Sequence, residues 1–189
     1  MNSIQEDEYP WYEIVEGNSL AQGDLLRNYE VAVPKALVEE GKRVPLELRT
    51  FDFVVMTQTC DIEHGKVASI LLCPWWDLWN FVDAATARGE NWGEKQREAL
   101  LQGNLPGYHL LNETVQGDIN LNIGVVDFHE IYTEPIELVR KFAESTGKRL
   151  RLLPPYREHL AQDFARFFMR VGLPVNIPKE KIKKRPTGR

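Results

Sequence analysis

The chain has 189 residues, of which 43% are hydrophobic and 27% are charged, and its formal net charge at pH 7 is −5. This composition is typical of a globular protein, and the length suffices for one domain with a substantial core. No apolar run approaches the roughly 20 residues of a membrane helix, and the N-terminal "MNSIQEDEYPWYEI" is acidic where a secretory signal would be basic. We therefore expect a cytoplasmic protein that does not bind membranes.

The first third of the chain reads as strands. The segments "YPWYEIV" and "LRNYEVAV" within residues 9–33 predict an opening strand pair, because the turn-forming "EGNSLAQGD" separates them. Pro34, Gly41 and Pro45 then predict a loop, with room for one helical turn at residues 35–40. The next segment, "LELRTFDFVVMTQ", alternates and then becomes continuously apolar, as a strand does when it enters a covered core. We expect "KVASILLCPW" to be its antiparallel partner.

Helical patterns follow in the middle of the chain. Four apolar residues of "WWDLWNFVDAATARG" recur at helical spacing: Trp75, Leu78, Trp79 and Val82. Gly89 is expected to end this helix, and "GEKQREALLQG" predicts a second, exposed helix. Residues 104–117 are rich in turn formers, and "INLNIGVVDFHEIY" returns to strand character.

The last third predicts two further helices. The first begins at Pro135 and ends at Gly147. The second begins after Pro155 and is stopped by Gly172 and Pro174. Its apolar residues recur at a spacing near 3.6: Tyr156, Leu160, Phe164, Phe167, Phe168 and Val171. This stripe is expected to pack on the sheet.

The charge is unevenly distributed along the chain. Residues 179–189, "KEKIKKRPTGR", carry six basic residues and one glutamate, a charge of +5, which leaves −10 on residues 1–178. An acidic body argues against a broad nucleic-acid-binding face, because such faces are basic. Within the tail, Lys183, Lys184 and Arg185 are candidate contacts to phosphates or to an acidic partner, and a flexible solubilising tail is the alternative.

Together these elements predict an α+β protein built on a small, curved, mostly antiparallel β-barrel. The barrel is expected over about residues 9–132, with a helical insertion at 75–103 and two C-terminal helices within 135–172. Residues 1–178 would form a single globular domain, and 179–189 a basic flexible tail.

Both cysteines of the chain lie in "FVVMTQTCDIEHGKVASILLCPWW", and they suggest a metal site. Cys60, His64 and Cys73 are possible zinc ligands, with His109 or Asp61 as a fourth, because zinc prefers thiolate and imidazole ligands. If 56–60 and 70–73 are paired strands, the two sulfurs would face each other. No close C-x2-C pair is present, however, and burial of Cys73 as a small hydrophobic residue is the alternative.

The same stretch suggests a thiol nucleophile. Cys60 is expected at a strand end, where His64 could lower the pKa of its thiol and Asp61 could orient the imidazole. His109 is a second candidate base, because it is expected in a loop between a helix and a strand. The structural alternative is that the polar residues around Cys60 only form a turn.

Three tryptophans lie within five residues, at positions 75, 76 and 79. On one helix, Trp75 and Trp79 would share a face while Trp76 turns partly away. At least one ring is then expected to be exposed, which marks Trp75 and Trp76 as candidate contacts to a ligand or partner. The alternative is that all three fill the seam between helix and barrel.

The order of "GDLL", a long loop, and "FDFVVMTQTCD…GKVASILLCPW" resembles the MazF/PemK-type toxin barrels over roughly residues 20–76. The resemblance implies a small β-barrel. The catalytic arginine of the family would fall near Phe51 and Asp52, where this sequence has no arginine, although Arg49 is close. The threonine of the family would fall near Trp76, and it is absent. The resemblance therefore implies the barrel fold without inherited ribonuclease activity.

These observations favour a binding or accessory module of a bacterial stress or defence system, which recognises a protein partner or a nucleic-acid or nucleotide ligand. No complete catalytic set is visible, and no cofactor is expected apart from zinc. The alternatives are a ribonuclease-like barrel or a thiol enzyme that uses Cys60, and a structural zinc-binding protein. The oligomeric state is left open.

Overall fold

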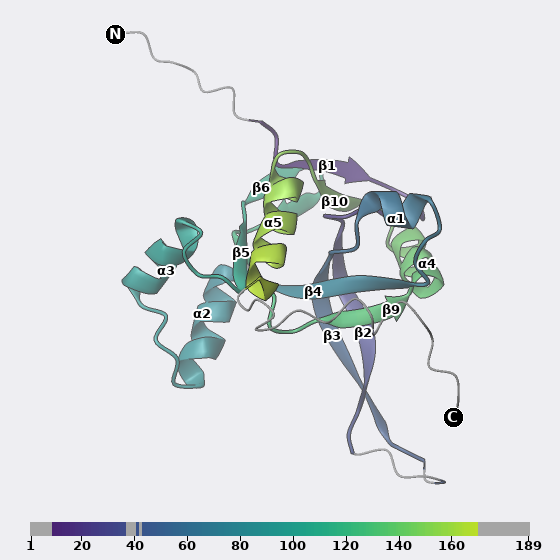
Figure 1. The fold of residues 1–189 in the computed structure, drawn as a ribbon, viewed down its shortest axis with the longest axis horizontal. Helices are drawn as coiled ribbons and strands as arrows, with labels where there is room; N and C mark the ends of the chain where they lie inside the picture. Colours follow the sequence, from purple (N-terminus) through teal and green to yellow (C-terminus); the bar gives the residue numbers. More distant parts are fainter. Residues whose placement is uncertain (1–8, 37–40, 42, 170–189) are drawn as a thin grey trace, which may run out of the picture.

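The structure is a computed structural model that describes residues 9–36, 41 and 43–169. These residues form five helices and three antiparallel sheets, so the α+β class is confirmed (Figure 1). The expected tail at 179–189, with Lys183, Lys184 and Arg185, lies outside the described residues. So does most of the helical turn expected at 35–40.

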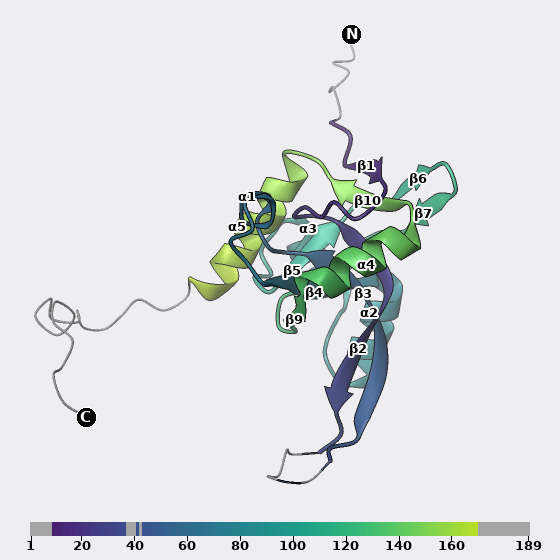
Figure 2. The ribbon, with the colours of Figure 1, turned by 90° about the vertical axis from the view of Figure 1, so that its right-hand side faces the viewer.

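The largest sheet has the strand order β2-β3-β4-β8-β5, and β9 also pairs with β4. Its strands are β2 (Leu25–Pro34), β3 (Leu46–Val55), β4 (Ser69–Asp77), β5 (Tyr108–Leu111), β8 (Gly124–Asp127) and β9 (Tyr132–Pro135). The expected pairing of β3 with β4 is confirmed. The far ends of β2 and β3 extend from the body as a two-stranded arm (Figure 2). Because no hydrogen-bonded pairing within the described ranges joins β5 back to β2, a closed barrel is not confirmed.

Two helices cover opposite faces of this sheet. On β4, Ile70 and Leu72 face one way and pack in a cluster with Val139 of α4 (Ile136–Thr146). Cys73 and Trp75 face the other way and pack in a cluster with Leu160 of α5 (Tyr156–Phe168). The strict alternation of a strand produces these two cores. Both C-terminal helices were predicted, and α4 begins after Pro135 and ends before Gly147 as expected. The predicted end of α5 at Gly172 is outside the described residues.

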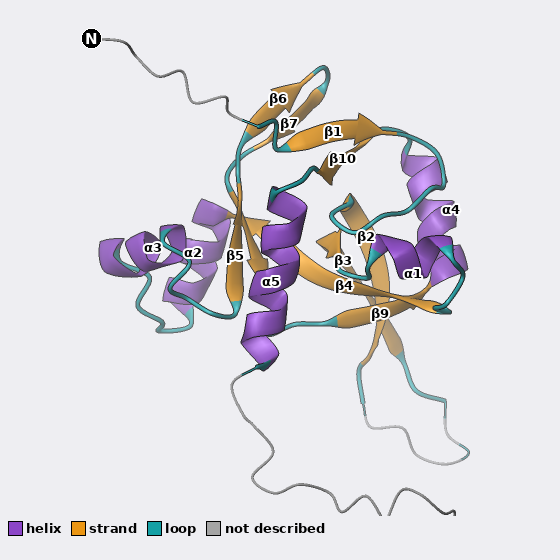
Figure 3. Cartoon of the chain, turned by 45° about the horizontal axis from the view of Figure 1, so that its top comes forward, coloured by secondary structure: helices purple, strands orange, loops and turns teal. Residues whose placement is uncertain are grey.

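The three remaining helices are short. They are α1 (Thr59–Glu63), α2 (Leu78–Ala87) and α3 (Glu94–Leu101). The pair α2 and α3 lies at one end of the molecule and α4 at the other (Figure 3). The longest helix in the described part of the chain has 13 residues, so none of them could cross a membrane.

The expected opening strand pair is wrong. Strand β1 (Tyr12–Val15) pairs with β10 (Arg149–Leu152), a strand that the sequence did not indicate, whereas β2 pairs with β3. The "EGNSLAQGD" segment between β1 and β2 therefore does not close a hairpin. Local turn propensity does not determine the partner of a strand, because pairing depends on contacts between segments that are distant in sequence.

Strand boundaries in the middle of the chain also differ from expectation. The turn-rich residues 104–117 contain β5 and β6 (Thr114–Gln116), and β6 forms a small hairpin with β7 (Ile119–Leu121). The strand character expected in "INLNIGVVDFHEIY" is confirmed, and it is divided among β7, β8 and the start of β9. Short strands interrupted by polar residues have too little periodicity to be resolved from sequence.

Candidate ligand-binding site

A pocket of about 370 Å³ lies over β2 and β3 beside the end of β4. We call it the Trp76 pocket. Its lining consists mostly of polar and aromatic side chains: Arg27, Asn28, Thr50, Phe51, Asp52, Trp75, Trp76, Asp77, Asn80 and Asn122. It therefore contains both tryptophans that the sequence indicated as binding residues, together with residues that the sequence did not indicate.

A β-bulge forms one wall of the pocket. The pairing of β2 with β3 shifts between Leu26 and Tyr29, so Arg27 and Asn28 fall outside the regular register. Asn28 adopts a left-handed backbone with φ of 56°, a conformation that asparagine tolerates better than most residues. Its N–H donates a hydrogen bond of 2.7 Å to Oδ1 of Asp52 on the neighbouring strand. This bond holds the bulge against β3.

The floor of the pocket is a cross-strand pair, Asp52 of β3 and Trp75 of β4. Residues directly opposite each other in an antiparallel pair have their side chains on the same face, with Cβ atoms about 5 Å apart. Trp75 is buried, and the guanidinium carbon of Arg27 lies 5.6 Å from the centroid of its ring. This distance is within the range of a cation–π contact.

The indole N–H of Trp75 is buried and has no hydrogen-bond acceptor among the described residues. A buried donor without an acceptor costs about 1–3 kcal/mol of stability. Most buried polar groups in native proteins are satisfied, so the exceptions call for an explanation. Trp75 lines the pocket, but its indole nitrogen is itself buried and is not exposed to a ligand there.

Trp76 lies on the opposite face of β4 from Trp75, and 38% of its surface is exposed. Its ring makes an edge-to-face contact with Phe51, with the centroids 6.0 Å apart. The expectation that Trp75 and Trp76 lie on a helix is wrong, because α2 begins only at Leu78. Trp79, by contrast, is on α2, is 58% exposed and packs against Arg97 instead of joining helix to sheet.

The start of α2 is set by Asp77. Its Oδ1 accepts from the backbone N–H of Trp79 at 2.9 Å and of Asn80 at 3.2 Å, which caps the helix. Its Oδ2 accepts from Nδ2 of Asn122 at 3.0 Å. Both carboxylate oxygens of Asp77 are therefore used to hold the structure, and they fix the Asn122 amide at the pocket.

The chemistry of this lining suits binding better than catalysis. It offers an exposed aromatic ring, three side-chain amides, one arginine and two aspartates, and thus a formal charge of −1. None of the ten lining residues is a histidine, cysteine, serine or lysine. The pocket can therefore hold a flat, polar ligand by stacking and hydrogen bonding.

Cys60 was expected at a strand end, and this expectation is wrong. It lies on the short helix α1, where it is exposed. His64 ends this helix, and its Nδ1 lies 2.6 Å from the backbone oxygen of Cys60 instead of bonding the thiol. Asp61 forms an ion pair of 3.4 Å with Lys66. The imidazole thus has another partner. The Cys60 thiol donates weakly to Asp61 Oδ1 at 3.9 Å, and its sulfur remains accessible.

Cys73 is buried in the core, and burial raises the pKa of its thiol to about 12. The expected pairing of residues 56–60 with 70–73 is wrong, because β3 ends at Val55 and the strand partner of Cys73 is Val54. No group of three or more His, Cys, Asp or Glu side chains within the described residues could hold a metal ion. Cys60, His64 and Cys73 are therefore not brought together as a zinc site.

His109 lies on β5 and not in the expected loop. It is buried, and its Nδ1 lies 2.7 Å from Oδ2 of Asp163 on α5. Its Nε2 is buried without a partner in the described part of the chain. The residue thus belongs to the seam between β5 and α5, away from the candidate thiol chemistry on α1.

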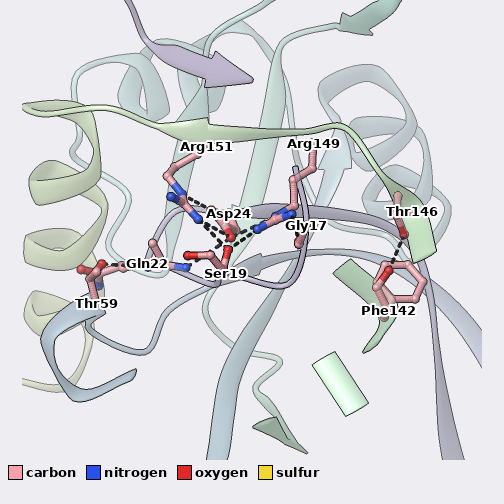
Figure 4. A network of polar contacts seen from close by, with 10 residues as sticks. Gly17, Ser19, Gln22, Asp24, Thr59, Phe142, Thr146, Arg149 and Arg151 are labelled. Atoms are coloured by element: carbon pink, nitrogen blue, oxygen red, sulfur yellow. Dashed lines mark hydrogen bonds and ion pairs between the residues drawn. The ribbon is translucent and has the colours of Figure 1, made fainter. Parts of the chain in front are cut away.

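A buried cluster of charged side chains at β10 was not predicted from the sequence. Asp24 is fully buried between two arginines of β10, Arg149 and Arg151 (Figure 4). Arg149 Nε donates to Asp24 Oδ2 at 3.0 Å, and Arg149 also donates to the backbone oxygens of Gly17 and Ser19. The alternating "RLRL" of residues 149–152 is the one sequence signal for it, because alternation places both arginines on one face. The cluster ties the loop before β2 to β10, the strand that pairs with β1.

Comparison with models of known protein families and with curated protein sequences found no match.

Proposed function

We propose that this protein is a non-enzymatic binding module that receives a nucleotide or a single-stranded nucleic acid in the Trp76 pocket. The observation that carries the proposal is a polar pocket that the exposed ring of Trp76 lines together with three side-chain amides, one arginine and two aspartates. An accessory role in a bacterial stress or defence system rests on the MazF/PemK resemblance alone.

The physical basis is the way in which proteins hold unpaired bases. A base stacks on an aromatic side chain while its edge bonds to polar groups, and each stacked base contributes about 1–3 kcal/mol. The Trp76 pocket contains both kinds of group. A duplex is disfavoured as ligand, because the pocket has a formal charge of −1 and the chain outside the tail is acidic.

The catalytic alternatives have less support. A thiol enzyme needs its base within hydrogen-bond reach of the sulfur, whereas His64 bonds the backbone oxygen of Cys60. A ribonuclease-like barrel would need a catalytic group near the pocket, and the lining contains one arginine, Arg27, which lies over Trp75.

A protein partner is the second candidate ligand, and a different surface favours it. A groove of about 470 Å³ runs between β2, β3 and α4, and the exposed side chains of Leu48 and Leu138 line it. Glu134 lies in the same groove, and burial raises the pKa of its carboxyl. Exposed apolar surface of this kind is typical of protein contacts.

The binding proposal is tested by fluorescence anisotropy with a labelled, mixed-sequence single-stranded RNA of about 12 nucleotides. Trp76→Leu is expected to weaken binding about tenfold, because it removes one stacking platform. Trp79→Leu is the matched control, since Trp79 is also exposed but does not line the pocket. Absence of binding by the wild type, or equal losses in the two variants, would contradict the proposal.

The contribution of the tail to nucleic-acid affinity can be separated from that of the pocket by the salt dependence of binding. Replacing Lys183, Lys184 and Arg185 with alanine is expected to reduce the slope of log affinity against log salt by about 2 if the three residues bind phosphates of a single strand. An unchanged slope would assign the nucleic-acid binding to the pocket alone.

A further inference from the structure

We propose that the Trp76 pocket selects guanine over the other bases. This inference rests on the proposed function, and it concerns which edge of the base the pocket can read. It starts from the Asp52 carboxylate, which lies on the same face of the sheet as Trp75, and from the Arg27 guanidinium over the Trp75 ring.

Asp52 and Arg27 offer opposite hydrogen-bonding groups in the pocket, and both have capacity for a ligand. Among the described residues, Asp52 accepts one hydrogen bond, from the Asn28 N–H to Oδ1, so its carboxylate retains free acceptor positions. Arg27, over the Trp75 ring, supplies donors. A complementary ligand therefore presents adjacent N–H donors to Asp52 and an acceptor to Arg27.

Guanine matches this pattern better than the other bases. Its N1–H and 2-amino group form two adjacent donors, which suit the two oxygens of a carboxylate, and its O6 and N7 are acceptors that suit arginine. Adenine and cytosine present one amino group beside an acceptor, and uracil presents one N–H between two acceptors. With these bases, the Asp52 carboxylate would face a ring acceptor.

The guanidinium group of an arginine side chain is the closest competitor, since it also has two adjacent donors and stacks on aromatic rings. It has no acceptor, however, so it could not accept a hydrogen bond from Arg27. Its positive charge would also meet Arg27 in the same pocket. These two features favour the base over a peptide.

The inference is tested by calorimetric titration of the full chain with GMP, IMP and AMP, which share one phosphate group. We expect GMP to bind at least about tenfold more tightly than AMP, because a specific bidentate contact contributes discrimination of this order. IMP lacks the 2-amino group and is expected to lose much of this preference. Asp52→Asn should reduce the ratio of GMP to AMP affinity towards one, whereas Asp83→Asn, on the exposed face of α2, should leave it unchanged.

The outcomes separate the two proposals. Equal affinities of the wild type for GMP, IMP and AMP would overturn guanine selection and leave nucleotide binding intact. Failure of all three nucleotides and of single-stranded RNA to bind would overturn both proposals. Tighter binding of an arginine tripeptide than of GMP would overturn guanine selection in favour of a peptide ligand. The IMP comparison uses the wild type, so it decides the question even where Asp52→Asn does not fold.

Discussion

Asp24 Oδ2 and Arg149 Nε lie 3.0 Å apart, although 125 positions separate the two residues along the chain. Both side chains are almost completely buried, and Arg151 bonds the same carboxylate. The cluster ties the loop before β2 to β10, and β10 in turn pairs with β1.

Removing Asp24 is expected to destabilise the fold strongly. Asp24→Ala would leave Arg149 buried without its counter-ion, and breaking a buried ion pair in this way costs about 3–5 kcal/mol. Urea unfolding measures the loss. Glu47→Ala is the control, because the ion pairs of Glu47 with Lys35 and Arg49 are solvent-exposed, and its effect should stay within about 0.5 kcal/mol. Similar losses in the two variants would show that the buried cluster does not hold the structure.

The hydrogen bond between His109 of β5 and Asp163 of α5 is expected to stabilise the packing of these two elements. Asp163→Ala leaves the buried imidazole without its partner and should lower the free energy of unfolding by about 1–3 kcal/mol. Arg166→Ala is the control, because Arg166 also contacts Asp163 but is largely exposed. If both variants unfold at the same denaturant concentration, the buried hydrogen bond has no special role.

The two thiols are expected to differ sharply in reactivity. An aromatic disulfide reagent at pH 8 should label one thiol of the native protein quickly, because Cys60 is exposed, and should reach Cys73 only after denaturation. Cys60→Ser should abolish the fast phase. Labelling of Cys60 only in denaturant would disprove its exposure and remove the thiol-enzyme alternative as well.

Stability is expected to decline at alkaline pH. Burial raises the pKa of Tyr108 to about 12, above the value near 10 of an unfolded tyrosine. The folded state thus holds this proton more tightly, so the stabilisation is complete below about pH 10 and is lost as pH rises towards 12. Tyr29 and Cys73, with pKa values also raised to about 12 by burial, act in the same direction.

Tyr108→Phe isolates one part of this effect. It removes one titrating group, so the decline in unfolding free energy between pH 10 and 12 should be shallower by up to about 1.4 kcal/mol per pH unit. Tyr9→Phe is the control, since the Tyr9 side chain is exposed. Urea unfolding at several pH values gives both slopes, and indistinguishable slopes in the two variants would refute the assignment to Tyr108.

Patterns within one element, and the pairing of two apolar runs that are close in sequence, were predictable from sequence. The limits of α4 follow from Pro135 and Gly147, and the pairing of β3 with β4 follows from two adjacent apolar runs. The burial of Cys73 was also among the sequence expectations, because it lies inside an apolar run. These features depend on backbone preferences and on short-range burial, which neighbouring residues determine.

The sequence by itself thus determined the α+β class, the C-terminal helices and the tryptophan-rich stretch. Only the tertiary structure decided that Trp75 and Trp76 lie on a strand, because the Asp77 side chain caps α2 and delays its start. Only strand register placed Asp52 opposite Trp75, and only the bulge brought Arg27 and Asn28 to them. A pocket built from cross-strand neighbours has no local signature, since its residues become neighbours only through hydrogen bonds between distant segments.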